Sequence, residues 1–136
     1  TEAEVNALKS FGTNFGMAFQ LIDDAIDYSS NKKILGKNTG DDFKEGKITL
    51  PIILAYGRSN DKEKKFWERT ISDLNQNDGD FEMALEIINK YQCIEDTLTR
   101  ANHFSNVAVD SVDIFKDNIY KEKLVSLVSK SVSRIY

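Results

Sequence analysis

Apolar or small residues recur at steps of three and four along the first part of the chain, from position 5 to position 26. This spacing is the period of an α-helix that presents one face to a core. The members of the series are Val5, Leu8, Gly12, Phe15, Phe19, Ile22 and Ile26. We therefore expect one long helix over residues 2–29.

Helix-breaking residues are scarce in the rest of the chain, because its 136 residues include one proline, Pro51, and seven glycines. Thr49, Asp61 and Asp80 are the expected N-caps of later helices, and Gly57 is an expected stop. The predicted helices cover residues 50–56, 61–74, 80–91, 93–115 and 119–135. The whole chain, residues 1–136, is thus predicted to form one all-α helical bundle.

Composition excludes several functions. A net charge of −4 argues against nucleic acid as a main partner, since that partner favours basic surfaces. No apolar run approaches the ~18 residues of a membrane span. The single cysteine, Cys93, cannot form an internal disulfide, and we expect a cytoplasmic setting. The chain starts at Thr1 within the helical pattern, so we expect it to be part of a longer protein.

Three aspartates lie inside the apolar helix, in the stretch "FQLIDDAIDY". At about 100° per residue around the helix axis, Asp27 lies about 40° from Asp23. Asp24 and Gln20 lie within about 100° of Asp23. The acids therefore form one stripe beside the apolar stripe. Carboxylates that converge repel one another, and a hard cation such as Mg²⁺ removes that repulsion. The alternative is a solvated acidic face, which the apolar neighbours make less favourable.

A segment rich in glycine and lysine follows, "GKNTGDDFKEGKITLP". Lys37 and Lys47 each come directly after a glycine, and glycine allows tight bends and close approach of the backbone to a ligand. A lysine ammonium binds phosphate groups as a point charge. Acids on a helix and lysines on the next loop are complementary to a metal ion with a diphosphate. An ordinary flexible loop with solvated lysines is the alternative.

These two stretches together resemble the trans-isoprenyl diphosphate synthases. Residues 19–27, "FQLIDDAID", resemble the second aspartate-rich motif of that family. Residues 35–52, "LGKNTGDDFKEGKITLPI", resemble the segment that follows the motif in long-chain bacterial polyprenyl synthases of the octaprenyl type. The resemblance implies that this chain is the C-terminal part of an isoprenoid synthase fold, with the N-terminal portion absent.

The resemblance also implies a reaction and a set of site residues. Isopentenyl diphosphate would be condensed with an allylic diphosphate after the allylic carbon–oxygen bond breaks. Asp23, Asp24 and Asp27 would hold Mg²⁺ directly or through its waters. Gln20, Lys37 and Lys47 would bind substrate, the lysines by neutralising the allylic diphosphate. No catalytic base is identified by the resemblance.

Parts of the family pattern are missing from this chain. A first aspartate-rich motif, a Lys-Thr pair and arginines lie upstream in the family and are absent here. We therefore expect that this chain alone does not catalyse prenyl transfer. Without its partner helices it should expose apolar surface from Phe11, Phe15 or Phe19. Such surface favours association, and the family forms dimers, so we expect a homo-oligomer.

Two other functions are compatible with parts of the pattern. The chain could be a non-catalytic helical subunit or interaction module derived from the same family. It could also belong to a terpene cyclase of similar helical architecture, although the segment from Lys37 to Pro51 matches the chain-elongating enzymes better. An intact first aspartate-rich motif upstream would favour the enzyme.

Overall fold

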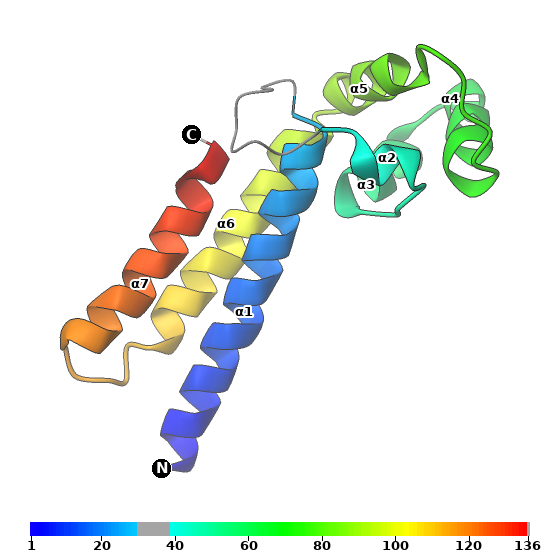
Figure 1. Cartoon of the computed structure of the whole chain (residues 1–136). Helices are drawn as coiled ribbons and strands as arrows, with labels where there is room; N and C mark the ends of the chain where they lie inside the picture. The colour runs from blue at the N-terminus through cyan, green and yellow to red at the C-terminus, as the bar shows by residue number, and fades with distance from the viewer. Residues whose placement is uncertain (30–38, 136) are drawn as a thin grey trace. The chain divides into compact units, whose positions relative to one another are not determined.

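The computed structural model describes residues 1–29 and 39–135, and these residues form helices and connecting turns without a strand (Figure 1). The prediction of an all-α chain is therefore confirmed. The elements are α1 (Glu2–Asp27), α2 (Asp41–Lys44), α3 (Leu50–Arg58), α4 (Asp61–Trp67), the π-helix η1 (Glu68–Ser72), α5 (Asp80–Lys90), α6 (Cys93–Ser111), α7 (Ile119–Val132) and the 3₁₀-helix η2 (Ser133–Ile135).

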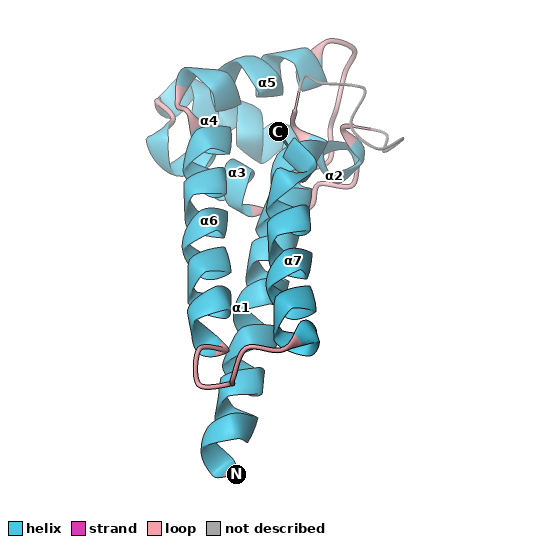
Figure 2. Ribbon diagram, turned by 90° about the vertical axis from the view of Figure 1, so that its left-hand side faces the viewer, coloured by secondary structure: helices cyan, strands magenta, loops and turns pink. Residues whose placement is uncertain are grey.

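The chain divides into two compact units, of which the first comprises residues 1–23 and 98–136. In this unit α1, α6 and α7 lie side by side, with α6 running opposite to the other two (Figures 1 and 2). Their core includes Phe11, Ala108, Val112 and Val128. The Ser10 and Ser111 hydroxyl oxygens lie 2.7 Å apart and add a polar contact between α1 and α6.

The second unit comprises residues 24–97 and consists of short helices around one core. The buried members of that core include Tyr28, Phe43, Trp67 and Ile88. The indole Nε1 of Trp67 donates to the Ser59 hydroxyl at 3.1 Å, so even the largest buried side chain has its polar atom satisfied. Many of the contacts that position the helices of this unit are hydrogen bonds from side chains to backbone.

Several predicted boundaries are wrong for local reasons. Asn60, and not Asp61, is the N-cap of α4, because its side chain accepts the Glu63 amide proton while Glu63 accepts the Asn60 amide proton. This is a complete capping box. Thr49 is the N-cap of α3 as predicted, although its side chain makes no capping hydrogen bond. Gly79 rather than Asp80 occupies the N-cap position of α5. Helix α3 continues past Gly57 to Arg58.

Apolar exposure on α1 is partly as predicted. Phe19 is 43% exposed, whereas Phe11 is buried because α6 and α7 cover it. The guanidinium of Arg134 lies 4.1 Å from the centroid of the Phe19 ring and donates to the Phe19 carbonyl oxygen. None of the described helices has the length and apolar character needed to span a bilayer.

Candidate functional site

The acids at the end of α1 are mostly buried. Asp24 is 6% exposed and Asp27 is 0% exposed, while Asp23 is partly buried and Gln20 is exposed. The alternative of a solvated acidic face therefore does not apply to Asp24 and Asp27. Burial of a carboxylate is costly unless hydrogen bonds or charge compensate for it. The surroundings of these two acids consequently define the candidate site.

Asp27 joins α1 to the short helix α2. Its carboxylate Oδ2 accepts a hydrogen bond from the backbone amide of Asp42 at 2.9 Å. Its carbonyl oxygen accepts another from the amide of Gly40 at 3.0 Å. Gly40, the N-cap of α2, has no side chain with which to cap the helix, so Asp27 supplies the acceptor from α1. The amides at a helix N-terminus favour a negatively charged acceptor, and an aspartate side chain suits this position.

Two glycines make this segment possible. Gly46 has φ +66°, and a Cβ at this position would lie 2.4 Å from a Leu74 methyl carbon and 2.8 Å from the Ile71 carbonyl oxygen. Gly40 has φ +95°, and a Cβ there would lie 3.0 Å from the Phe81 ring. Both positions are left-handed, where side chains other than glycine are strained. The tight bends predicted at these glycines are present.

Lys47 lies beside α2. Its ammonium nitrogen is 3.9 Å from Asp42 Oδ1, and its backbone amide donates to the Asp42 carbonyl oxygen at 2.9 Å. The Lys47 side chain is 51% exposed, so its ammonium can reach a ligand in solvent. Lys37, the other predicted diphosphate ligand, lies outside the described residues. Asp42 was not predicted as a site residue, although it lies five positions before Lys47 in the segment rich in glycine and lysine.

Tyr28 completes the buried cluster. Its side chain is 2% exposed, and its hydroxyl has no hydrogen-bond partner among the described residues. Burial raises the pKa of Tyr28, and the negative charges of Asp42, Asp27 and Asp24 raise it further, with Asp42 the strongest of the three. We call Asp24, Asp27, Asp42 and Tyr28 the acid cluster. The phenol therefore remains protonated and can donate a hydrogen bond.

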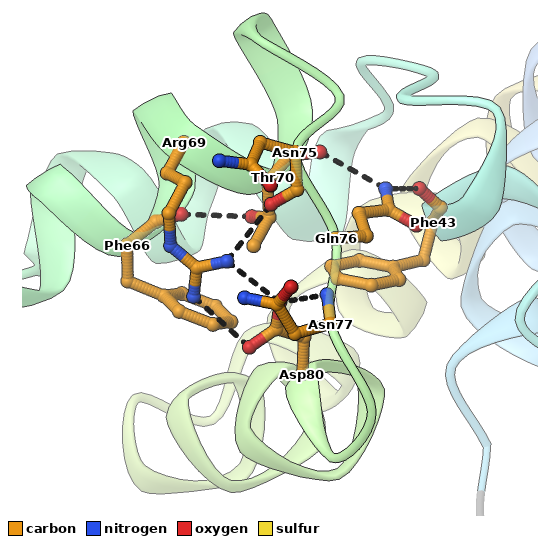
Figure 3. A network of polar contacts seen from close by, with 8 residues as sticks. All are labelled: Phe43, Phe66, Arg69, Thr70, Asn75, Gln76, Asn77 and Asp80. Atoms are coloured by element: carbon orange, nitrogen blue, oxygen red, sulfur yellow. Dashed lines mark hydrogen bonds and ion pairs between the residues drawn. The ribbon is translucent and has the colours of Figure 1, made fainter.

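A polar network that contacts Phe43 of α2 supports this arrangement (Figure 3). The Gln76 amide nitrogen donates to the carbonyl oxygens of Phe43, at 2.7 Å, and Thr70, at 2.9 Å. Arg69 clamps Asp80 through two nitrogens at 2.8 and 3.0 Å. We call the Arg69–Asp80 pair the clamp. It fixes the turn that carries Gln76, and Gln76 in turn fixes the last part of α2.

The carboxylates of this site suit a hard cation that also binds phosphate oxygens of a substrate. They suit a metal bound only by protein side chains less well. Among residues 1–29 and 39–135, no three side chains of His, Cys, Asp or Glu converge on one point where a metal could bind. Magnesium in proteins is commonly held by one or two carboxylates, with water and substrate phosphates as its other ligands. Carboxylate oxygens beside a solvent-reaching lysine satisfy that requirement.

The sequence comparisons identify a family. A family model described as polyprenyl synthetase matches residues 1–88. The octaprenyl diphosphate synthase of Haemophilus influenzae is 38% identical over 136 residues, which are 100% of this chain and 41% of that protein. An all-trans-nonaprenyl-diphosphate synthase of Rhodobacter capsulatus is 33% identical over 94% of this chain and 39% of its own length.

Solved structures give the same result. A decaprenyl diphosphate synthase from Rhodobacter capsulatus matches with a TM-score of 0.93 and 35% identity, covering 100% of this chain and 42% of that one. A polyprenyl synthase from Caulobacter crescentus, complexed with calcium and isoprenyl diphosphate, matches with a TM-score of 0.88 and 42% identity. That match covers 98% of this chain and 40% of the other. This chain thus spans about two fifths of the length of these relatives.

Proposed function

Since this chain belongs to the polyprenyl synthetase family, we propose that it supplies part of the metal and diphosphate site of a prenyltransferase. The whole protein would condense isopentenyl diphosphate with an allylic diphosphate to make a long-chain polyprenyl diphosphate. The observation that carries the proposal is the burial of Asp24 and Asp27 beside Asp42, which lies next to the solvent-reaching Lys47.

In this proposal the acids at the end of α1 are the second aspartate-rich site. Asp23, Asp24 and Asp27 would hold Mg²⁺ directly or through its waters, and Gln20 would contact substrate. A bound Mg²⁺ would supply Lewis acidity toward the departing diphosphate. Calcium in the Caulobacter crescentus complex supports a hard divalent cation, because calcium and magnesium both prefer oxygen ligands.

The chain's own residues would bind and orient the diphosphate. Lys47 would neutralise phosphate oxygens, and Lys37 would act in the same way. Asp27 would have a second role, because its hydrogen bond to the Asp42 amide fixes the segment that presents Lys47. Fixed charges aimed at a departing anion cost little reorganisation when the bond breaks, and this is a major source of catalysis.

We test the site with a double substitution, Asp23→Asn with Asp27→Asn. Asparagine retains an oxygen that can accept the Asp42 amide proton, so α2 keeps its cap while the charges are removed. Titration calorimetry with Mg²⁺ and methylene diphosphonate, a diphosphate analogue, should show loss of Mg²⁺-dependent binding. The exposed pair Asp73→Asn with Asp78→Asn changes the net charge equally and should bind normally. Unchanged binding by the first pair would refute the proposed site.

The proposal extends to the whole protein. It would be a cytoplasmic homo-oligomer, and this chain alone would not condense the two diphosphates, because the first aspartate-rich motif is not part of its sequence. Exposed Phe19 supports association. Sedimentation of this chain at tens of micromolar should give a mass above that of a monomer. A monomeric mass, or turnover by the isolated chain, would contradict the corresponding part of the proposal.

A further inference from the structure

A groove of about 600 Å³ lies between α4 and α5, within the second unit. An ion pair joins the two helices at each end. The Lys90 ammonium, at the end of α5, lies 3.1 Å from a Glu63 carboxylate oxygen in the first turn of α4. The clamp joins Arg69, which follows α4, to Asp80 in the first turn of α5 (Figure 3). These two ion pairs fix the spacing of the helices on either side of the groove.

The floor of the groove is apolar. Phe66 and Ile87 are buried, whereas Met83 is 49% exposed. Methionine is flexible and polarizable, so an exposed one adapts readily to an apolar partner. Each helix contributes four lining positions with the spacing i, i+3, i+4 and i+7, which is one helical face. These positions are Lys62, Lys65, Phe66 and Arg69 from α4 and η1, and Met83, Glu86, Ile87 and Lys90 from α5. Two such faces form the kind of groove that an amphipathic helix occupies.

The α4 side of the groove carries an uncompensated positive charge. Lys62 and Lys65 are exposed, and neither ammonium forms an ion pair or a hydrogen bond with the described residues. The lining as a whole has four basic and two acidic side chains, although the net charge of the chain is −4. Exposed lysines are usually only solvated. Beside an apolar floor, however, they are complementary to the acidic flank of an amphipathic partner.

We propose that this groove docks an amphipathic helix of a partner protein, whose apolar stripe covers Met83 and whose acidic flank faces Lys62 and Lys65. A helix fits better than an extended peptide, because it satisfies its own backbone hydrogen bonds and both walls of the groove are helical. A basic flank would place like charges against the two lysines. The inference is independent of the proposed function, since no lining residue belongs to the acid cluster or is a lysine assigned to diphosphate.

A synthetic peptide tests the charge complementarity. The probe is a stapled helix of about four turns, with leucines at i, i+3, i+4 and i+7 and glutamates along one flank. Fluorescence anisotropy of the labelled peptide should give a dissociation constant of about 10–100 μM, as expected for a small interface. Lys62→Glu with Lys65→Glu should weaken binding at least about tenfold, and a peptide with lysines in place of the glutamates should prefer this variant. Lys123→Glu with Lys130→Glu, both exposed on α7, changes the net charge equally and should bind normally.

Met83→Gln tests the apolar floor without a change in charge. Glutamine keeps an unbranched side chain of similar length but is polar, so the affinity for the acidic peptide should fall about fivefold. Met17→Gln is the matched control, because Met17 lies on α1 and is 45% exposed, close to the 49% of Met83. That variant should bind normally. Addition of the peptide should change the amide chemical shifts of residues 60–69 and 83–90.

Several results would overturn the inference. No binding at about 1 mM peptide would do so, as would equal losses in the two lysine pairs or shift changes confined to other residues. A sedimentation mass that falls to that of a monomer in Lys62→Glu with Lys65→Glu would assign the groove to a second copy of this chain. Flotation with phosphatidylglycerol vesicles that is lost in the same variant would assign it to a lipid surface. Either outcome would replace the partner helix.

Discussion

Asp80 and Asp27 are buried aspartates of the second unit, and each accepts a hydrogen bond from a backbone amide. The charged groups that surround the two carboxylates differ. Asp80 faces the Arg69 guanidinium through both oxygens and also accepts the Asn77 amide proton at 2.7 Å. Asp27 accepts a backbone amide proton and has Asp24 and Asp42 as acidic companions around Tyr28. The clamp joins opposite charges at hydrogen-bond distance, whereas the acid cluster brings three acids together and the ion pair that Asp42 makes with Lys47 is long at 3.9 Å.

This difference separates a structural carboxylate from one suited to a ligand. Arg69 holds the pKa of Asp80 below its usual range, with help from the Asn77 amide, so the clamp is complete without any other molecule. Like charges that are brought together raise the free energy of the unloaded protein, and a bound cation lowers it again. The comparison predicts that changes in the clamp affect stability and that changes in the acid cluster affect binding.

The largest effect should come from distorting the segment that carries Asp42 and Lys47. Gly46→Ala combines a left-handed backbone with a clash against the Ile71 carbonyl oxygen, and should cost about 3 kcal/mol of unfolding free energy. Urea unfolding measures this loss. Gly79→Ala is the control, since Gly79 has φ +87° but open space around the added Cβ. Its cost should be about 1 kcal/mol, and equal losses would contradict the role assigned to the clash.

Breaking the clamp should reduce stability without changing binding. Asp80→Ala leaves Arg69 without its carboxylate and the Asn77 amide without its acceptor, so unfolding should become about 2 kcal/mol easier. Chemical denaturation reports the loss, and calorimetry with Mg²⁺ and methylene diphosphonate should give an unchanged affinity under conditions where the variant is folded. Weaker binding by the folded variant would show that the two regions are not separable.

The acid cluster should show the opposite behaviour. Asp42→Asn removes one of the clustered charges, so the unloaded chain should be no less stable, while affinity for Mg²⁺ and methylene diphosphonate should fall about tenfold. The neighbouring exposed Asp41→Asn provides a control with the same change in net charge. A similar loss of affinity in both variants would indicate a general charge effect and would remove the distinction between the two regions.

The smallest effect is a pH dependence of the clamp. Because the pKa of Asp80 is lowered in the folded chain, its stabilising contribution is complete above the unfolded pKa of about 3.9 and disappears as the pH falls through the folded pKa. The stability difference between the unsubstituted chain and Asp80→Asn should therefore be constant from pH 7 to about pH 5 and shrink below about pH 4. Urea unfolding at these pH values measures it, and a constant difference down to pH 2 would contradict the assignment.

Much of the fold was accessible from periodicity. The apolar series from Val5 to Ile26 predicted α1 to within a few residues, and the family resemblance stated from residues 19–27 and 35–52 is confirmed by the family match. Local signals were less reliable. Asn60 caps α4 because Glu63 returns the hydrogen bond, and the predicted helix over residues 61–74 becomes a π-helix at Glu68 and ends at Ser72.

The residues of the candidate site were only partly predictable. Asp23, Asp24 and Asp27 share a helix, so their common face follows from helical geometry alone, and their assignment to a metal remains a prediction. Asp42, Tyr28 and Gln76 were missed because their roles depend on residues that are distant in the sequence. The Asp42 amide donates to Asp27, 15 positions away, and the Gln76 amide donates to Phe43, 33 positions away. Tyr28 packs in a core with Phe43 and Phe81. No local pattern encodes such pairings.

The sequence by itself determined that the chain is helical, that acids and lysines lie on neighbouring segments, and which family it belongs to. These properties follow from residue type and from spacing along the sequence. Only the tertiary structure decided which acids are buried, that Asp27 caps α2, and that the Tyr28 hydroxyl is buried without a hydrogen-bond partner among the described residues. Burial and hydrogen bonding depend on distances between remote residues, and those distances are set by packing.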